Sequence, residues 1–425
     1  MKLALWGYGN HGRDMELILT ECWADRYQIT AVFDQRFAEL GPSDILGLPV
    51  SDPDNAAAMY RDGVYEGMLI TVFNAGECKR IERQLNERGI PVAHLDCANR
   101  RRAPESFAQW EKPIVLPQKG YTRFCFRDQY LQLTRRHRIP FVFDKEGTIN
   151  NAFWQPYQIT GTPYMALYAP RTDKPCVELK GDWCLATGVF SDNYWHFTYE
   201  ALDHVWAMEK SGYQGRYLMT KSTFAPILCD LIGVDPARVS WLEDLEIDTN
   251  YQIERLYYPV LKGDAFTLSA PVLADMAEAV REKLLPDERE YPERIYVKRI
   301  GIRKLFLPQS WLDEHGFVTI IPEEHSVEEQ IRYFMHAKII LSPHGANSTN
   351  SLYMTPGSVL IETFPNCYVH PCCLDTCAQR GIHYLMVSEV SYMAASHASY
   401  PGTDYSLKTV QLDLALHTAE VLTDK

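Results

Sequence analysis

Short apolar runs alternate with longer amphipathic stretches through the first hundred residues. Apolar runs at residues 2–6, 29–33, 68–73 and 91–95 have the length of buried strands. Helical spacing of apolar positions follows the first run as far as residue 21 or 22, and recurs at residues 78–88. Strands that alternate with helices are typical of a parallel sheet covered on both faces. Residues 1–100 are therefore predicted to form an α/β domain.

The next stretch, residues 101–175, has a different texture. Prolines interrupt it repeatedly, which predicts a connector with a few helical turns rather than a further domain; they are Pro104, Pro113, Pro117, Pro140, Pro156, Pro163, Pro170 and Pro175.

The pattern of strands and helices returns in residues 176–288 and 289–425, which we interpret as two further α/β units. In the last unit, strands are predicted at residues 295–298, 317–321, 339–342, 359–364 and 384–387. A helix is predicted at residues 327–336, where Ser326 and Glu329 have the spacing of a capping box.

Composition narrows the class of protein. The 425 residues are 46% hydrophobic and 23% charged, as in globular proteins, and the net charge of −13 argues against a nucleic-acid binder. Apolar runs are far shorter than the roughly 20 residues that span a bilayer. The first run stops at Gly7, too early for a secretion signal, so we expect no export and a cytoplasmic location. The eleven cysteines, scattered along the chain, are expected to be reduced thiols.

Two kinds of cluster leave alternatives open. A first basic cluster comprises Arg100, Arg101 and Arg102. A second basic cluster, of Arg135, Arg136 and Arg138, is a solvated helix face or a contact for an acidic membrane surface or a polyanionic acceptor. A cysteine cluster near the end of the chain comprises His370, Cys372, Cys373 and Cys377. Its side chains are expected to pack in the core. A metal site is less favoured, because the spacing fits no strong zinc pattern.

A glycine motif follows the first predicted strand. Gly7, Gly9 and Gly12 have the G-x-G-x-x-G spacing, and Asp34 ends the next strand 22 residues after Gly12. In a dinucleotide site, the glycines let backbone amides approach a pyrophosphate and the carboxylate binds ribose hydroxyls. The stretch from residue 6 to 14 also resembles the N-terminal Rossmann-like domain of bacterial sugar acyltransferases, which holds a nucleotide-sugar. Nucleotide binding and a purely structural role both remain open.

A second motif surrounds His196. If Asn193 lies near the start of a helix, His196 and Glu200 are four residues apart and share one face. A carboxylate beside an imidazole can orient it as a general base. The alternative, a core histidine satisfied by its helical neighbour, is favoured by spacing alone.

The densest motif runs from Ser342 to Glu362. A strand ends in His344, Gly345 and small polar residues that begin a helix, which would leave backbone amides free for an anion. Upstream, four cations follow a predicted strand and could bind a diphosphate; they are Lys298, Arg299, Arg303 and Lys304. Each piece alone is equally explained by ordinary turn chemistry or a solvated basic loop.

Taken together, these motifs resemble glycosyltransferase family 61, found in capsule and cell-wall clusters. The resemblance covers residues 176–390 and rests on Asn193, His196, Glu200, Arg299, Arg303, Glu329, Gln330, His344, Gly345, Ala346, Asn350 and Glu362. Family members usually have a second glycine shortly after the Gly-Ala pair, where this chain has Asn347 and Ser348. The approach of the backbone to the donor is therefore expected to differ in detail.

The resemblance implies a GT-B architecture of two Rossmann-like domains, here preceded by the additional N-terminal domain. Residues 176–288 would form the acceptor side, and residues 289–425, with a C-terminal helix, would bind the donor. The implied activity is inverting transfer of a hexosyl or pentosyl group from a nucleotide-diphosphate sugar to a glycan hydroxyl in cell-surface polysaccharide synthesis. No metal or cofactor is implied, and the only Asp-x-Asp, Asp52-Pro53-Asp54, is expected to be a turn.

The resemblance also implies residue roles. His196 would be the base, Glu200 would orient it, and Asn193 would position the acceptor or the base. Glu362 would hold the ribose, while the rest of the donor site would comprise Arg299, Arg303, Lys304, His344, Gly345, Ala346, Asn347 and Asn350. Peripheral attachment to the inner membrane or to a polysaccharide complex is a further expectation. The alternatives are an inactive sugar-nucleotide-binding protein and an NAD-dependent sugar oxidoreductase that uses the Gly7 motif.

Overall fold

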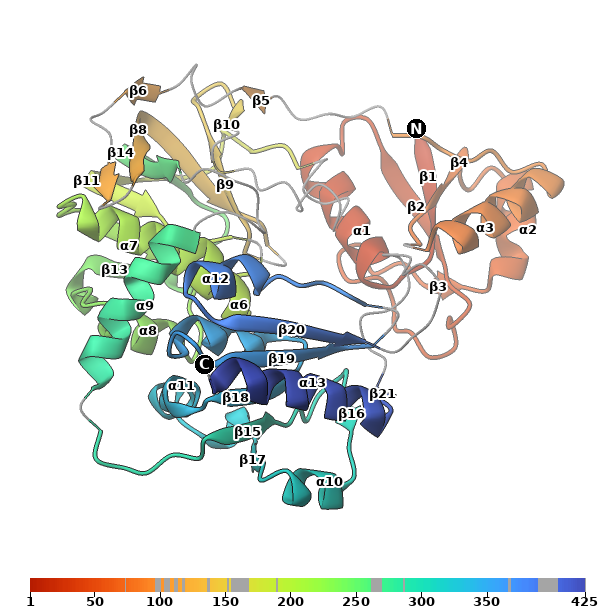
Figure 1. Ribbon diagram of the computed structural model, residues 1–425. Helices are drawn as coiled ribbons and strands as arrows, with labels where there is room; N and C mark the ends of the chain where they lie inside the picture. Colours follow the sequence, from red (N-terminus) through yellow and green to blue (C-terminus); the bar gives the residue numbers. More distant parts are fainter. Residues whose placement is uncertain are drawn as a thin grey trace. The chain divides into compact units, whose positions relative to one another are not determined.

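The computed structural model describes residues 1–72, 74–95, 101–102, 108–110, 114–116, 119–135, 138–150, 153, 168–188, 190–260, 270–285, 287–365, 368–388 and 404–424. Contacts divide the chain into two units, each of which draws on distant segments. Unit 1 comprises residues 1–108, 126–180 and 246–254, and unit 2 comprises residues 109–125, 181–245 and 255–425. The structure is an α/β protein whose elements are labelled in Figure 1.

The first domain has the parallel sheet that its sequence predicts. Strands β1 (Lys2–Trp6), β2 (Gln28–Phe33), β3 (Val50–Ser51) and β4 (Gly67–Ile70) lie in the order β3-β2-β1-β4. Helices α1 (Asn10–Cys22), α2 (Ala56–Arg61) and α3 (Ala75–Glu87) connect or follow them. Trp6, Phe33, Tyr65 and Leu85 belong to its core. The strand predicted at residues 91–95 is reduced to a single bridge between Val92 and Met68.

The prediction of a connector with helical turns was wrong for the described part of residues 119–150, because these residues form strands. These are β8 (Lys119–Leu133), β9 (Pro140–Phe143) and β10 (Ile149–Asn150), and β9 pairs antiparallel with β8 from Tyr130 to Leu133. Leu131, Gln132 and Leu133 are all fully buried, so both faces of β8 are covered at this point. Pro140 does not interrupt the strand because it is its first residue. The prolines at 104, 113, 117, 156 and 163 lie outside the described residues.

Short strands complete this region and the middle of the chain. They are β5 (Arg101–Arg102), β6 (Ala108–Trp110) and β7 (Ile114–Leu116), and the longer strand β14 (Asn250–Val260) follows later in the chain. In unit 2, β11 (Cys176–Leu185), β12 (Arg216–Met219) and β13 (Val239–Trp241) pair in parallel, through residues 183–185 of β11. Their helices are α6 (Tyr194–Phe197), the π-helical turn η4 (Thr198–Leu202), α7 (Asp203–Lys210), α8 (Ala225–Leu231) and α9 (Ala270–Leu284).

The last part of unit 2 is a five-stranded parallel sheet. Its strands are β15 (Arg294–Val297), β17 (Val318–Ile320), β18 (Ile339–Pro343), β19 (Val359–Phe364) and β20 (His383–Ser388), which confirms the five predicted strands with small shifts at their ends. The order is β17-β15-β18-β19-β20, so the chain reverses its direction of strand addition between β15 and β18. That reversal is the switch point of a doubly wound sheet, where ligands bind at the carboxyl ends of the strands.

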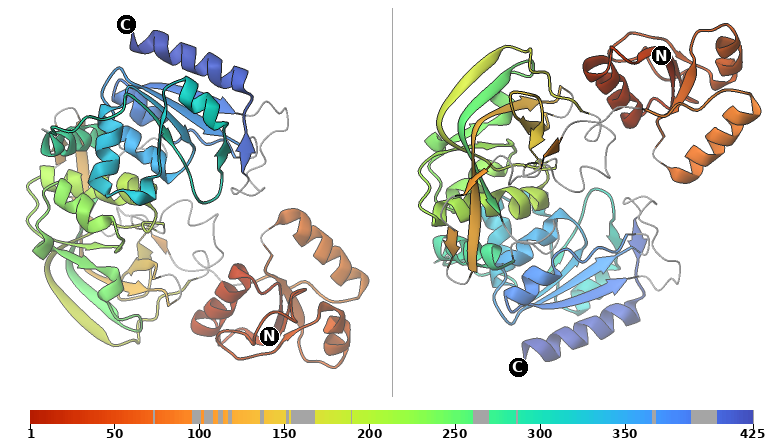
Figure 2. Two further views of the ribbon diagram at one scale, coloured as in Figure 1. Left: turned by 90° about the horizontal axis from the view of Figure 1, so that it is seen from below. Right: turned by 90° about the horizontal axis from the view of Figure 1, so that it is seen from above.

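Both faces of this sheet are covered. Ile340 and Leu360 join the larger core with Phe334 of α11 (Val327–His336), whereas Leu341 and Ile361 join a second core. Helix α13 (Thr409–Thr423) runs along that second face (Figure 2). The remaining elements are α10 (Gln309–Glu314), α12 (Leu374–Gln379) and the paired strands β16 (Leu305–Phe306) and β21 (Tyr405–Ser406). Among the described residues, the helices are too short or too polar to cross a membrane.

Along the chain, the contacts change unit after residues 108, 125, 180, 245 and 254. They keep residues 181–245 and 255–425 together, so no boundary between units falls near residue 288. One continuous hydrophobic core, which includes Cys184, Tyr217, Met276 and Leu360, explains why these segments form one unit.

Candidate functional site

The predicted donor residues gather around the switch point of the five-stranded sheet. Lys298 and Arg299 directly follow β15, and His344 and Gly345 directly follow β18, its neighbour in the sheet (Figure 1). Because the two strands are parallel, both segments emerge at the same edge. The sheet therefore assembles two motifs that are more than forty residues apart in the sequence.

Gly345 lets the Arg299 guanidinium lie against the turn. Arg299 donates from Nη1 to the carbonyl of His344 at 3.2 Å and from Nε to the carbonyl of Ile302 at 3.0 Å. A Cβ atom at position 345 would fall 1.4 Å from Nη1, so a larger residue would displace the guanidinium. Burial, together with repulsion from Arg303, lowers the pKa of Arg299.

The cations of this loop are poorly compensated. Among the residues that the structure describes, neither Arg299 nor Arg303 has an ion pair with a carboxylate. The Arg303 guanidinium lies 4.8 Å from the ring centre of Tyr368. Its buried Nε also has no hydrogen-bond partner within the described ranges. Lys304 is 3.9 Å from Asp404. Two arginines in this state favour an anionic ligand.

The helix after the turn is a 3₁₀-helix, η8 (Ala346–Tyr353), capped at Gly345. Ala346 and Asn347 are half-buried at its start, where the first backbone amides of a helix lack internal partners. The predicted helix start is therefore confirmed, although the helix is not an α-helix. Asn350, further along η8, is fully buried.

His344 belongs to a chain of hydrogen bonds across three neighbouring strands. Its Nδ1 lies 2.9 Å from Oε1 of Glu362, which is on β19, and Tyr384 on β20 donates its hydroxyl to Oε2. Glu362 is fully buried and His344 is 5% exposed. Glu362, which we expected to accept from ribose hydroxyls, thus holds His344 in this structure. Sequence analysis did not single out Tyr384, because a lone tyrosine on a strand carries no motif.

The helix around His196 has the predicted start and the predicted pair. The side chain of Asn193 caps it by accepting from the amide of Trp195 at 3.0 Å. His196 Nδ1 lies 3.0 Å from Oε2 of Glu200, with the His196 side chain 26% exposed and that of Glu200 5% exposed. Glu200 lies in the π-helical turn η4, an irregularity that is frequent at functional sites. A partly exposed imidazole oriented by a buried carboxylate suits general-base chemistry.

A hydrogen bond joins this helix to the donor motif. Tyr194, the first residue of α6, donates its hydroxyl to Oδ1 of Asn350 at 2.7 Å. The contact joins the motif around His196 to the motif from Ser342 to Glu362 within unit 2. Asn350, which we expected to line the donor pocket, here contacts Tyr194. No sequence signal identified Tyr194 for this role.

The N-terminal glycine motif has the expected strand, turn and helix. Gly7 has a φ of +100°, and a Cβ atom at Gly12 would fall 2.1 Å from the Gly7 carbonyl oxygen. Gly9 is the N-cap residue of α1. Asp34 is 7% exposed and accepts from the amide of Tyr8 at 2.7 Å and from the backbone and guanidinium of Arg36. The carboxylate therefore already has partners within the domain, and nucleotide binding there stays a prediction.

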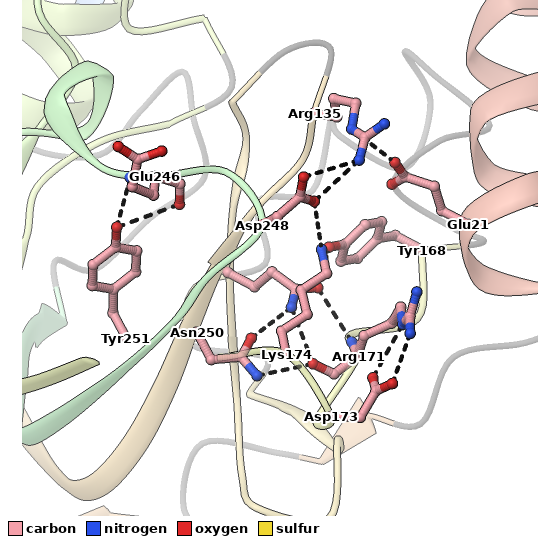
Figure 3. A network of polar contacts seen from close by, with 11 residues as sticks. Glu21, Arg135, Tyr168, Arg171, Asp173, Lys174, Glu246, Asp248, Asn250 and Tyr251 are labelled. Atoms are coloured by element: carbon pink, nitrogen blue, oxygen red, sulfur yellow. Dashed lines mark hydrogen bonds and ion pairs between the residues drawn. The ribbon is translucent and has the colours of Figure 1, made fainter. Parts of the chain in front are cut away.

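The described members of the second basic cluster, Arg135 and Arg138, do not lie on a helix. Arg135 follows strand β8 and pairs with Glu21 at 3.1 Å and with Asp248 at 3.0 Å (Figure 3). Lys174 also approaches Asp248, at 3.5 Å. The charge of Arg135 is thus compensated inside unit 1, and Arg138 has a left-handed backbone, with φ of +49°. Arg100 and Arg136 lie outside the described residues.

The cysteine cluster lies next to the donor motif. Cys373 and Cys377 are buried. Hydrogen bonds from Cys373 and then His370, against the opposing effect of burial, lower the pKa of Cys372 to about 6. In the part of the chain that the structure describes, no three histidine, cysteine or carboxylate side chains are arranged to hold a metal ion. Asp52 accepts from the amide of Asp54 at 2.9 Å, which confirms the expected turn.

Comparison with known families agrees with the resemblance. Residues 194–361 match the model of the family glycosyltransferase 61. This stretch of the chain is similar to that family. The match contains His196, Glu200, Arg299, Arg303 and His344 and ends one residue before Glu362. No curated protein matches the chain. The family match supports glycosyltransferase activity in general.

Proposed function

We propose that the chain is an inverting glycosyltransferase that transfers a hexosyl or pentosyl group from a nucleotide-diphosphate sugar to a glycan hydroxyl. The observation that carries this proposal is that Arg299 and Arg303, beside the turn at the switch point, form no ion pair with a carboxylate within the described part of the chain. That edge of a doubly wound sheet is where such folds bind ligands. A nucleoside diphosphate supplies the negative charge that the two arginines lack.

On the donor side, Arg299 and Arg303 bind the diphosphate, and Lys304 adds a third cation nearby. Backbone amides at Gly345, Ala346 and Asn347 provide further donors at the start of η8. Since the leaving group gains negative charge as the sugar departs, fixed cations stabilise the transition state more than the ground state. This chemistry requires no metal ion and no cofactor.

On the acceptor side, His196 removes the proton from the attacking hydroxyl. Glu200 fixes the ring orientation of His196 through Nδ1, and the ring takes the proton on its other nitrogen, Nε2. Asn193 caps the helix that carries His196 and so positions the base. The hydroxyl attacks the anomeric carbon opposite the departing diphosphate, which inverts the configuration.

The wider proposal follows the resemblance. The segment 176–288 and the segment 289–425 are the acceptor and donor halves of a GT-B enzyme, with residues 1–100 as an additional Rossmann-like domain. The partners are a nucleotide-sugar and a glycan acceptor of the cell surface, with no nucleic acid. We place the enzyme in the cytoplasm, peripherally at the inner membrane or in a polysaccharide complex.

The test is the release of nucleoside diphosphate from a panel of nucleotide-diphosphate sugars, with cell-surface oligosaccharides as acceptors. Replacement of His196 by Ala should lower the transfer rate by about 10²- to 10⁴-fold, the usual contribution of a general base. His325→Ala is the matched control, since His325, just before α11, also pairs with a carboxylate four residues away, Glu329.

Activity of the His196→Ala variant within threefold of wild type would remove His196 from this role. Binding of a nucleotide-sugar by wild type without any turnover would identify a sugar-nucleotide-binding protein instead. A change in nicotinamide absorbance with a nucleotide-sugar would identify an oxidoreductase.

A further inference from the structure

His344 is held so that one ring nitrogen has a fixed partner and the other has none. Nδ1 lies 2.9 Å from Oε1 of Glu362, and the ring stacks on Phe364 with centroids 4.9 Å apart. Across the described residues, Nε2 of His344 has no hydrogen-bond partner. Nε2 is therefore the atom of the His344 ring that can form a hydrogen bond with a bound ligand.

Glu362 is suited to holding His344 and not to touching a ligand. It is fully buried, and each of its oxygens already accepts a hydrogen bond, one from His344 and one from Tyr384. A buried carboxylate is costly unless its oxygens are paired in this way. Burial, and then the charge of Glu362, raise the pKa of Tyr384, so its hydroxyl stays a donor. His344 directly follows β18, and Glu362 and Tyr384 lie on the neighbouring strands β19 and β20.

The backbone of the same histidine contacts the cation of the donor site. Arg299 donates to the His344 carbonyl, and a Cβ on the next residue, Gly345, would collide with its guanidinium. His344 also lies near Tyr368 and His370, with ring centroids 5.5 and 6.4 Å away. The guanidinium of Arg303 lies over the ring of Tyr368, 4.8 Å from its centre. The imidazole thus lies in the arginine-lined region that the proposed function assigns to the diphosphate.

We propose that His344 donates a proton from Nε2 to the leaving phosphate, with Glu362 and Tyr384 as the positioning residues that hold its ring. The inference rests on the proposed function. The bond from the anomeric carbon to the phosphate oxygen breaks as the bond to the acceptor oxygen forms. His196 takes the acceptor proton, and the phosphate oxygen that departs takes the proton of His344. Exchange with water then restores both rings.

Two amide variants separate the nitrogens of His344. In His344→Asn the amide NH₂ can replace the Nδ1 donor to Glu362, but nothing replaces Nε2. In His344→Gln the amide reaches the position of Nε2 while the bond to Glu362 is lost. Calorimetric titration of the full chain with uridine, guanosine and cytidine diphosphates and monophosphates measures the contact.

The Asn variant should bind the preferred diphosphate about 10- to 100-fold more weakly, the usual effect of one charged hydrogen bond. Its affinity for the corresponding monophosphate should stay within threefold, and the Gln variant should recover part of the loss. Tyr384→Phe should lower the transfer rate and shift its pH profile with little change in the affinity for the donor. His315→Asn, at the end of α10, is the control for a histidine replacement in the same domain.

If wild type binds no nucleoside diphosphate, the proposed function fails and the inference fails with it. If wild type binds one and His344→Asn binds it equally well, only the assignment of His344 is wrong. An equal loss of diphosphate and monophosphate affinity would also overturn it, because the contact would then not be to the terminal phosphate.

Discussion

A missing side-chain carbon at position 345 leaves the space that Arg299 occupies. The backbone of Gly345 is extended, so any residue could adopt it, and the glycine is required by the close approach of the guanidinium. The absence of a side chain at Gly345 therefore decides where the charge of Arg299 lies.

Replacement of Gly345 by Ala should therefore displace Arg299 without unfolding the sheet. We expect the affinity for the preferred nucleoside diphosphate to fall about tenfold, since one charged contact is misplaced. The melting temperature should change little, because the atom in collision is the end of a flexible side chain. Calorimetry and thermal unfolding check the two expectations, and Gly357→Ala, at a φ of +87°, provides a control that destabilises without touching Arg299.

Cys372 should react differently from the other partly exposed thiols. Hydrogen bonds from Cys373 and His370 lower the pKa of Cys372 and favour its thiolate, whereas burial raises the pKa of Cys22 to about 11. Iodoacetamide at pH 7 should modify Cys372 before Cys22, and the rate at Cys372 should fall as the pH is lowered. Mass spectrometry of peptides after brief labelling measures this. Equal labelling of Cys22 and Cys372 would contradict the assignment.

At the scale of elements, turns and helix starts determine how neighbouring strands and helices pack and where the His196 helix lies. The chain from β1 to α1 packs so closely that Gly12 faces the carbonyl of Gly7. The helix of His196 depends on its cap at Asn193 and on the π-helical turn at Glu200. The positions of polar groups such as the His196 side chain therefore depend on how the helix that carries them begins.

Gly12→Ala should destabilise the N-terminal domain by about 2–4 kcal/mol, because the new Cβ would meet backbone and not a movable side chain. Chemical denaturation followed by tryptophan fluorescence, with Trp6 as a reporter, measures the loss. Gly63→Ala also lies in this domain at positive φ but in open space, so it should cost less. A loss at Gly12 no larger than at Gly63 would show that the close packing is unimportant.

Regular elements were predictable from the sequence where apolar periodicity was strong. The strands of the last sheet and helix α1 follow directly from runs such as Ile339–Pro343 and from the spacing of Leu17 and its neighbours. Strands β8 and β9 were missed because prolines such as Pro140 suggested a connector, although a proline at the first residue of a strand costs no ladder hydrogen bond.

The site was predictable only in part. Asn193, His196 and Glu200 lie as their spacing predicts, since an i,i+4 pair is a local property. The partners of Glu362 and Asn350 were not predictable, because His344, Tyr384 and Tyr194 reach them through strand order and packing between distant segments. No local pattern in one sequence records such contacts.

At the scale of the whole molecule, a chain of net charge −13 places Arg299 and Arg303, which form no ion pair with a carboxylate within the described residues, at one edge of one sheet. Outside that edge, Arg135 is paired with carboxylates in unit 1, as Figure 3 shows. The contrast directs an anionic ligand to the loop after β15, and screening by salt should weaken its binding.

Calorimetric titration of the full chain with uridine, guanosine and cytidine diphosphates tests the central claim most directly. We predict that one of them binds, and that Arg299→Ala weakens its binding at least tenfold. Arg294→Ala, at the opposite end of β15, should leave the affinity unchanged. Binding that is equally strong in wild type and in Arg299→Ala, or no binding of any nucleoside diphosphate, would contradict the account.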